Sequence, residues 1–243
     1  MDESDSLPLM GDENRLRPLG AEESFRFSCH SGVSCFTECC RELELALSPY
    51  DVVRLRQNLA LSSKNFLEQY AIIEFSLDDD YPKVYLAMID DGRASCPFVS
   101  AAGCGVYTDR PAACRTYPIG RGASLDQNGE AREQFVIITE DHCRGFAEEH
   151  SQTVNEWQND QQAKDFNRSN DRLLPLLTHD LDQPFPRLSD EKARLYIDTL
   201  YRLDQFKIPL TLNGPDQEAV PADEQAVLIN AINWLQQQWQ TAR

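Results

Sequence analysis

The sequence predicts an α+β fold, in which a small antiparallel sheet and short helices surround a cysteine cluster and a helical C-terminal region packs on them. Three observations support this prediction. Short β-rich runs bounded by turn residues lie between the cysteines. Amphipathic helical patterns follow in the second half of the chain. All eight cysteines lie at or before Cys143, which separates a cysteine-bearing region from a cysteine-free one.

The distribution of these features divides the chain into three parts. Residues 1–20 are acidic at first and contain glycines and prolines, which is typical of a disordered acidic tail. Residues 21–150 contain every cysteine and are expected to form a cysteine-cluster metal-binding domain. Residues 151–243 are expected to be a helical region packed on that domain. A chain of 243 residues can bury a sizeable core, so it does not need disulfides for stability.

A helix is predicted to begin after the first cysteines. Ser48 can cap it, Pro49 suits its first position, and Asp51 stands three residues after the cap. The apolar face of this helix contains Val52, Leu55 and Leu59.

The next predicted elements are a second helix and a hairpin. Ser63 can cap a short helix that carries Phe66, Leu67 and Tyr70. The β-rich runs 71–77 and 83–89 are separated by an acidic segment that ends in Tyr-Pro, which indicates a hairpin. Residues 133–139 are a third strand candidate.

The C-terminal region reads as three helices. Residues 151–178 are predicted to be the first, and Ser189 can cap the second. Residues 221–240 carry a clear apolar stripe, which indicates a helix packed on the core. The stripe consists of Leu228, Ala231, Ile232, Leu235 and Trp239.

Charge and hydropathy exclude several classes of partner. The chain has 40 acidic and 23 basic residues, a net charge of −17. Nucleic acids and anionic membrane surfaces require a basic face, so neither is an expected partner. No apolar run approaches the roughly 20 residues of a membrane span, and the N-terminus lacks the basic and apolar segments of a signal peptide. We therefore expect a cytoplasmic protein with reduced thiols rather than four disulfides.

Residues around the later cysteines favour defined turns. Gly103 and Gly105 flank Cys104 and permit close backbone turns. A single helical turn carrying Cys114 is favoured by Asp109 and Pro111. Pro118 ends that turn, because a proline disfavours helical conformation in the residue before it.

The spacing of the cysteines leaves the metal open. Thiolates are soft ligands that suit zinc and iron–sulfur clusters. The chain contains no C-x-x-C pair, and the side chains of the adjacent Cys39 and Cys40 should diverge. Such irregular spacing suits an iron–sulfur cluster at least as well as zinc, and eight cysteines could also form two four-cysteine zinc sites.

Several of these motifs together resemble the CxxCxxCC cysteine-cluster family. They are the block ending in Cys39-Cys40-Arg41, the segment Leu47-Ser48-Pro49-Tyr50-Asp51, Cys96-Pro97-Phe98, Cys104-x-x-Tyr107, and Arg110-Pro111-x-x-Cys114-Arg115-x-Tyr117-Pro118. The resemblance covers about residues 27–143. It implies a zinc- or iron-chelating domain, and some relatives are flagellin lysine N-methylases thought to carry an iron–sulfur cluster. The chain departs from the family pattern by having five residues between Cys29 and Cys35 and three between Cys35 and Cys39.

The candidate metal ligands are the eight cysteines: Cys29, Cys35, Cys39, Cys40, Cys96, Cys104, Cys114 and Cys143. If only four bind, we expect Cys96, Cys104, Cys114 and one of the pair Cys39 and Cys40. The alternative for each is a small buried apolar side chain. His30 and His142 each adjoin a cysteine and could complete a mixed site, although solvent-exposed histidines are the more ordinary interpretation.

Four further residues accompany the cysteines. Arg110 and Arg115 could donate to thiolate sulfur or hold an anion, whereas structural ion pairs are the plainer interpretation in so acidic a chain. Tyr107 and Tyr117 could shield a cluster from water or simply pack in the core.

The leading function is therefore a cytoplasmic protein that binds a metal ion or cluster, with iron, as an iron–sulfur cluster, or zinc as cofactor. A second interpretation, by family analogy alone, is an S-adenosylmethionine-dependent protein lysine methylase. A third is a metal-stabilised module whose helical region docks a protein partner. Because nucleotide-binding and hydrolase motifs are missing, the sequence leaves open whether the protein is an enzyme.

Overall fold

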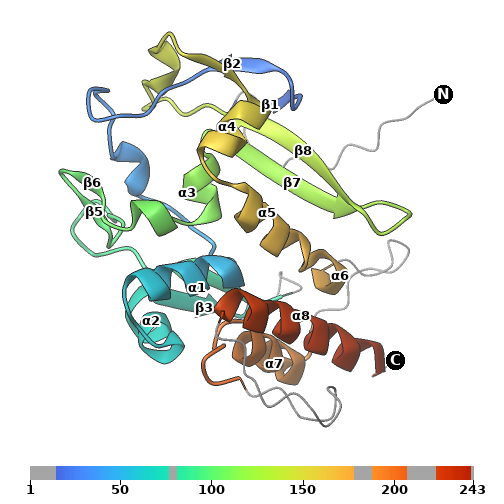
Figure 1. The fold of residues 1–243 in the computed structure, drawn as a ribbon. Helices are drawn as coiled ribbons and strands as arrows, with labels where there is room; N and C mark the ends of the chain where they lie inside the picture. Colours follow the sequence, from blue (N-terminus) through green and yellow to red (C-terminus); the bar gives the residue numbers. More distant parts are fainter. Residues whose placement is uncertain (1–14, 77–80, 178–187, 207–222, 242–243) are drawn as a thin grey trace.

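The computed structural model describes residues 15–76, 81–177, 188–206 and 223–241 (Figure 1). It confirms the α+β class: small antiparallel sheets and short helices are followed by C-terminal helices. The three-stranded sheet lies in the upper part of the view, and the layer that includes the C-terminal helices lies at the bottom (Figure 1). Among the described helices, none combines the length and apolar character needed to cross a membrane.

The three-stranded sheet has the antiparallel order β1-β8-β7. Its strands are β1 (Leu16–Leu19), β7 (Ile119–Leu125) and β8 (Ala131–Ile138). The turn between β7 and β8 requires Gly129, whose φ is 77°, a conformation that other residues rarely adopt. The prediction of a strand at 133–139 is confirmed by β8.

β1 corrects the expected tail over residues 1–20. Leu16–Leu19 pairs with β8, and Leu19 is buried, so this end of the segment is ordered by the sheet. Pro18 is compatible with pairing because β1 is an edge strand, where a missing N–H is tolerated. Residues 1–14 lie outside the described part of the chain.

A small core lies beside this sheet. It contains Leu19, Phe25, Phe27, Ile119, Ile137, Val154 and Trp157. Phe25 comes from β2 (Ser24–Arg26), which pairs with β9 (Ser151–Thr153). The rings of Phe27 and Trp157 meet edge to face at 5.5 Å. The 3₁₀ turn η3 (Gly145–Ala147) lies against β2 and carries Phe146 to the ring of Phe27.

A large core lies in the helical layer. Helix α1 (Pro49–Asn58) begins with the predicted capping box between Ser48 and Asp51. Helix α2 (Ser63–Tyr70) also forms where expected, but its cap is Ser62 rather than Ser63, because the Ser62 hydroxyl accepts from the backbone of Asn65. Strands β3 (Ala71–Glu74) and β4 (Lys83–Leu86) form the predicted antiparallel pair, and residues 77–80 of the connecting segment lie outside the described residues.

The segment predicted as one helix over residues 151–178 is broken. It contains β9, α4 (Val154–Asp160), α5 (Lys164–Asp171) and α6 (Leu174–Leu177). Thr153 ends the strand and caps α4 with its hydroxyl. Gln162 then takes a positive φ of 53°, which separates α4 from α5. Residue 178 lies outside the described part.

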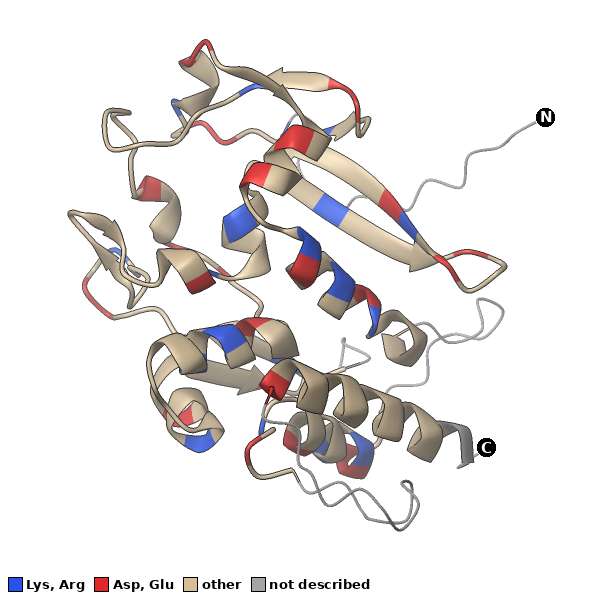
Figure 2. Ribbon diagram, in the orientation of Figure 1, with Lys and Arg blue, Asp and Glu red and all other residues tan. Residues whose placement is uncertain are grey.

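The other two C-terminal helices are confirmed. Helix α7 (Asp190–Leu200) is capped by Ser189, and α8 (Glu224–Thr241) carries the predicted stripe. Residues 221 and 222 of the predicted segment lie outside the described residues. Beyond Glu224, α8 carries no charged residue (Figure 2). Its stripe is buried in the large core together with residues of α1, α2 and β4, so the C-terminal helices share one core with the cysteine-bearing region.

Four small elements lie in the cysteine-bearing region, and three of them carry Cys39, Cys40, Cys104 and Cys114. They are η1 (Glu38–Cys40), the two-stranded ribbon of β5 (Val99–Ser100) and β6 (Gly103–Cys104), η2 (Tyr107–Asp109) and α3 (Ala112–Thr116). All eight cysteines are free.

Candidate metal centre

The helical turn that carries Cys114 is fixed at both ends. Pro111 stands at the N-cap of α3 in extended conformation, and Tyr117 leaves the helix at φ −48° and ψ 131°. The sequence predicts both features, because a proline fixes the start and Pro118 excludes helical conformation at Tyr117. Cys114 thus lies on a short turn whose direction the neighbouring residues determine.

Asp51 connects this turn to α1, a role that the sequence did not reveal. One carboxylate oxygen accepts from the backbone of Ser48 and closes the capping box, at 2.8 Å. The other accepts from the backbone N–H of Ala112, also at 2.8 Å. The side chain is buried, and burial raises its pKa against the lowering effect of these hydrogen bonds. The capping pattern in the sequence predicts the contact with Ser48, but nothing in the sequence predicts the contact with Ala112.

The ribbon that carries Cys104 requires its glycine. Gly103 has a φ of 111°, and a Cβ there would meet the Phe36 ring at 3.2 Å. Gly105 donates its N–H to the carbonyl of Phe98 at 2.8 Å. The ribbon therefore turns tightly enough to present the Cys104 side chain, as the sequence predicts.

Backbone N–H groups near the sulfurs of Cys96 and Cys104 oppose the effect of burial on their pKa. Burial raises the pKa of each thiol, whereas N–H groups facing its sulfur lower it. These donors come from Phe98 and Val99 for Cys96 and from Val106 for Cys104. The Cys96 backbone itself donates to the carbonyl of Cys40 at 2.8 Å, which ties this segment to η1.

We call Cys39, Cys96, Cys104 and Cys114 the first sulfur group. Cys39 is close enough to raise the pKa of each of the other three. Burial is the main reason why the pKa of those three thiols is raised. The pKa of Cys39 itself is raised mainly by a hydrogen bond with the Cys40 thiol. Cys114 exposes part of its surface to solvent, but protein atoms crowd its other side and raise its pKa well above the ordinary value. Three separate segments of the chain thus place the other three thiols within electrostatic reach of Cys39.

We call Cys29, Cys35 and Cys143 the second sulfur group. Burial raises the pKa of Cys29 to about 11, and Cys39, Cys35 and Cys143 add to this effect. The backbone N–H of Arg144 donates to the Cys35 sulfur at 3.1 Å. Burial raises the pKa of Cys143, and the facing Tyr117 hydroxyl lowers it.

Gly145 holds the two segments of the second group together. Its carbonyl accepts from the backbone of Ser28 at 3.1 Å. A Cβ at this position would meet the Phe27 ring at 2.6 Å and the Ser28 carbonyl oxygen at 2.7 Å. Only glycine allows so close an approach, which accounts for the Cys-Arg-Gly sequence that begins at Cys143.

The two histidines next to cysteines pair with carboxylates. His30 lies 3.3 Å from Glu148, and His142 lies 3.7 Å from Glu140. Within the described residues, no three histidine, cysteine or acidic side chains are already spaced as the ligands of a bound metal ion. The cysteines therefore form two groups, and in neither group are the described side chains spaced as the ligands of a bound metal ion.

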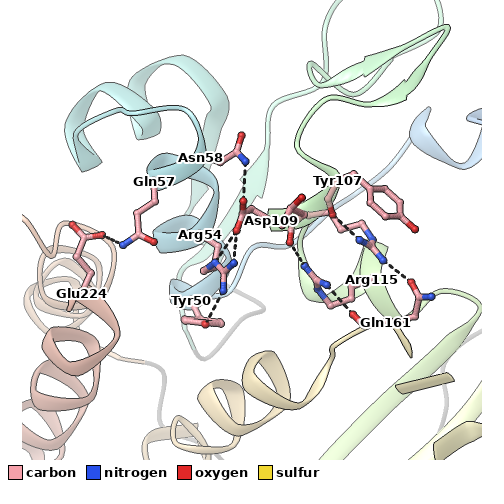
Figure 3. A network of polar contacts seen from close by, with 11 residues as sticks. Tyr50, Arg54, Gln57, Asn58, Tyr107, Asp109, Arg115, Gln161 and Glu224 are labelled. Carbon is pink, nitrogen blue, oxygen red and sulfur yellow. Dashed lines mark hydrogen bonds and ion pairs between the residues drawn. The ribbon is translucent and has the colours of Figure 1, made fainter. Parts of the chain in front are cut away.

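The arginines of the Arg-Pro-x-x-Cys-Arg motif are buried. Arg115 donates to the carbonyls of Thr108 and Gln161, each at 2.7 Å (Figure 3). Burial and the charges of Arg110 and Arg54 lower the pKa of Arg115 to about 10. In the described part of the chain, neither Arg110 nor Arg115 has a carboxylate within ion-pair distance, so the expected structural ion pairs are wrong for these residues.

The two tyrosines differ. Tyr107 is 60% exposed, so it neither shields the cysteines nor packs in a core. Tyr117 packs against the small core and meets the ring of Phe27 edge to face at 6.0 Å. Tyr117 is thus the only one of the two that combines core packing with a position beside a cysteine.

Fold and site together define an α+β protein with a cysteine-rich candidate metal centre. The chain belongs to the CxxCxxCC family, because the family model, described as a "Putative zinc- or iron-chelating domain", matches residues 28–163. The protein thus carries a zinc- or iron-chelating domain. Comparison with curated proteins and with solved structures gave no match.

The residues present fit such a metal. The first sulfur group supplies four soft donors, the number that a structural zinc ion or an iron–sulfur cluster takes from cysteine. Backbone N–H groups already face two of these sulfurs and would stabilise their charged form. The second group supplies three more sulfurs next to Cys39.

Proposed function

We propose that the first sulfur group, Cys39, Cys96, Cys104 and Cys114, holds the metal of this domain as an iron–sulfur cluster. The observation that supports the proposal is that Cys39 in η1 lies close enough to influence the thiols of Cys96, of Cys104 in β6 and of Cys114 in α3, while the backbone of Cys96 donates to the carbonyl of Cys40 at 2.8 Å. An iron–sulfur cluster accepts thiolates from wherever the fold supplies them, and donors to sulfur tune it. Zinc in a four-cysteine site is the alternative.

The chain's own residues have separate roles in this proposal. The four thiolates bind the metal, and the backbone N–H groups of Phe98, Val99 and Val106 favour the charged form of Cys96 and Cys104. Asp51 orients the turn that carries Cys114. When bound, an iron–sulfur cluster supplies one-electron chemistry, whereas zinc supplies structural stability.

The test is metal and acid-labile sulfide analysis of protein purified without oxygen, together with its absorption spectrum. Iron, sulfide and visible absorption are expected, and they should be lost in Cys96→Ser, Cys104→Ser and Cys114→Ser. Cys40→Ser is the matched control, because it alters the neighbouring thiol in η1 without removing a proposed ligand. If the protein contains zinc and no sulfide, the zinc site is supported and the iron–sulfur cluster is rejected. If it contains no metal, both are rejected.

A cleft beside α3 supports a second candidate function, an S-adenosylmethionine-dependent protein lysine methylase. Its volume is about 810 Å³, within the range of cofactor sites. Its lining includes Thr116, Tyr117, Gly120, Arg121, Asn167 and Asn170. Calorimetry with S-adenosylmethionine tests this candidate, and an absence of binding heat at millimolar cofactor would reject it.

A protein partner for the helical region and a cytoplasmic location complete the proposal. The free state of the cysteines supports a reducing compartment. Cell fractionation tests the location. For the partner, a pull-down that is lost on deleting residues 189–243 would support the proposal, and an unchanged pull-down would oppose it.

A further inference from the structure

A groove lies between the β7–β8 hairpin on one side and helices α4 and α5 on the other. Its volume is about 800 Å³, which is within the range of ligand sites. The hairpin contributes Leu125 and Phe135 to the lining, and the helices contribute basic and amide side chains. We call it the α5 groove. No cysteine lines it, so it is separate from the candidate metal centre.

One wall of the α5 groove is a row of three basic side chains. Lys164, Arg168 and Arg172 follow one another at intervals of four residues, so they share one face of α5 and its helical C-cap (Figure 2). Within the described residues, Lys164 and Arg172 have no carboxylate at ion-pair distance, and Arg168 has only Asp165, at 3.6 Å. Both side chains of that pair are more than 60% exposed, so the pair is weak.

The two acids that line the groove are already paired. Asp171 accepts two hydrogen bonds from Arg121, at 2.7 and 2.8 Å, and Glu133 accepts one at 3.1 Å. The row of basic side chains is therefore not matched by acids of the groove itself. Because the chain as a whole has a net charge of −17, this row is a local exception to its acidic character. Such a local field favours a ligand that carries negative charge.

Gln158 adds an unused hydrogen-bond donor to the same groove. The residue is 6% exposed, and its side-chain oxygen accepts from Asn167 Nδ2 at 3.0 Å. Its side-chain nitrogen has no acceptor among the described residues. A buried N–H without an acceptor is costly, so an oxygen of a bound ligand would be stabilised there. Asn155 and Asn159 also line the groove, and amide side chains both donate and accept, as a peptide backbone does.

The spacing of the basic side chains suits an extended peptide. Four residues of a helix rise about 6 Å, and two residues of an extended strand rise about 6.6 Å. Side chains at every second position of a strand point to the same side. Acidic residues at alternate positions would therefore face Lys164, Arg168 and Arg172 in turn, while the amide side chains of α4 are available to the backbone.

We propose that the α5 groove binds an extended segment of a partner protein that carries acidic residues at alternate positions. The basic row pairs with the acids, and Gln158 donates to a backbone oxygen of the segment. The inference does not require bound metal, so it stands or falls independently of the proposed function. The groove is also separate from residues 189–243, the region for which a partner is proposed above.

The first experiment uses a fluorescein-labelled octapeptide of alternating Glu and Thr and measures its fluorescence anisotropy as the full-length protein is added. The protein should bind this peptide at low ionic strength and lose most of the affinity at about 0.5 M salt, which screens exposed charges. A peptide of the same composition with its four Glu residues contiguous should bind at least about threefold more weakly. A peptide with Gln in place of Glu should not bind measurably.

The second experiment repeats the titration with variants of the basic row. Lys164→Gln, Arg168→Gln and Arg172→Gln should each weaken binding about two- to fivefold, and the triple variant more than about tenfold. These side chains are exposed, so the variants should fold as the wild type does. Arg194→Gln is the matched control, because it removes the same charge from an exposed position of α7 outside the groove.

A third variant tests the donor rather than the charge. Gln158→Met removes the amide and nearly keeps the length of the side chain, so it should weaken binding about threefold without changing the dependence on salt. Because Gln158 is buried, its melting temperature is measured beside that of the wild type.

Three results would overturn the inference. The first is absence of binding by the wild type at about millimolar protein, and the second is unchanged binding in the triple variant. The third is equal affinity for the alternating peptide, the contiguous peptide and a single-stranded oligonucleotide of the same charge, because the groove would then recognise any polyanion.

Discussion

The two cores of this protein hold their cysteines differently. Cys96 and Cys104 pack against the large core, which also contains the C-terminal helices. Cys143 packs against the small core beside the three-stranded sheet. Cys96 and Cys104 therefore depend on a core that includes the C-terminal helices, whereas the second sulfur group depends on the packing of Phe27 against Gly145 and Phe146. A substitution that destabilises one core should therefore affect one sulfur group more than the other.

The largest effect should follow loss of a ligand on the turn between the cores. Cys114→Ser is expected to abolish bound metal or reduce it severely, because serine oxygen is a poor substitute for thiolate on a soft metal. Metal content by plasma emission spectrometry measures this, with Cys40→Ser as control. Full metal retention in Cys114→Ser would exclude this turn from the centre.

Removal of the metal should be the next largest effect. The ligands enclose long stretches of chain, so binding adds stability that the metal-free protein lacks. A bound metal at about a thousand times its Kd contributes about 4 kcal/mol, which corresponds to roughly 10 °C in a chain of this size. Calorimetry before and after anaerobic chelation should reveal the shift, and an unchanged transition after verified metal loss would contradict it.

Asp51→Ala should have an intermediate effect on both stability and metal content. It removes the acceptor for the backbone of Ser48, which caps α1, and for the backbone of Ala112, which joins α1 to α3. We expect a loss of about 2 to 4 kcal/mol, from the lost cap and the unsatisfied N–H groups. Urea unfolding measures it, and Ser62→Ala, which removes only the cap of α2, should cost less.

The smallest effect should come from the second sulfur group. Cys143 packs against the small core and is not one of the four proposed ligands. Bound metal should therefore fall less in Cys143→Ser than in Cys114→Ser. Metal analysis of all eight single serine variants would sharpen the comparison between the cores. Complete and equal loss in every variant would mean that both groups act as one unit or as two interdependent sites.

The sequence predicted elements best where local chemistry decides the outcome. The capping box of α1, the cap of α7 and the apolar stripe of α8 are visible in single segments. Strand β7 escaped prediction because it contains two glycines, and a Cβ at Gly120 would meet Val136 at 2.8 Å. That requirement arises from β8, a partner that the pattern of β7 does not reveal.

In the candidate site, too, local features could be predicted from the sequence and contacts between distant segments could not. All eight cysteines and the turn of Cys114 could be identified from motifs, because proline and glycine fix the backbone locally. Their grouping could not be identified in this way, since η1 is tied to the later cysteines by the hydrogen bond from the Cys96 backbone to the Cys40 carbonyl, a contact between distant segments. Nor did the motif show that Arg110 lacks a carboxylate partner among the described residues, since that depends on Asp109 turning toward α1.

The position of Trp157 gives this protein an internal optical reporter. Its indole N–H donates to the carbonyl of Thr116 at 2.8 Å, and Thr116 is the last residue of the turn that carries Cys114. The other two tryptophans, Trp234 and Trp239, lie on α8. An iron–sulfur chromophore absorbs where tryptophan emits and so quenches nearby fluorescence by energy transfer, whereas zinc has no such absorption. With Trp234 and Trp239 replaced, the emission of Trp157 is therefore expected to follow both the occupancy and the identity of the metal.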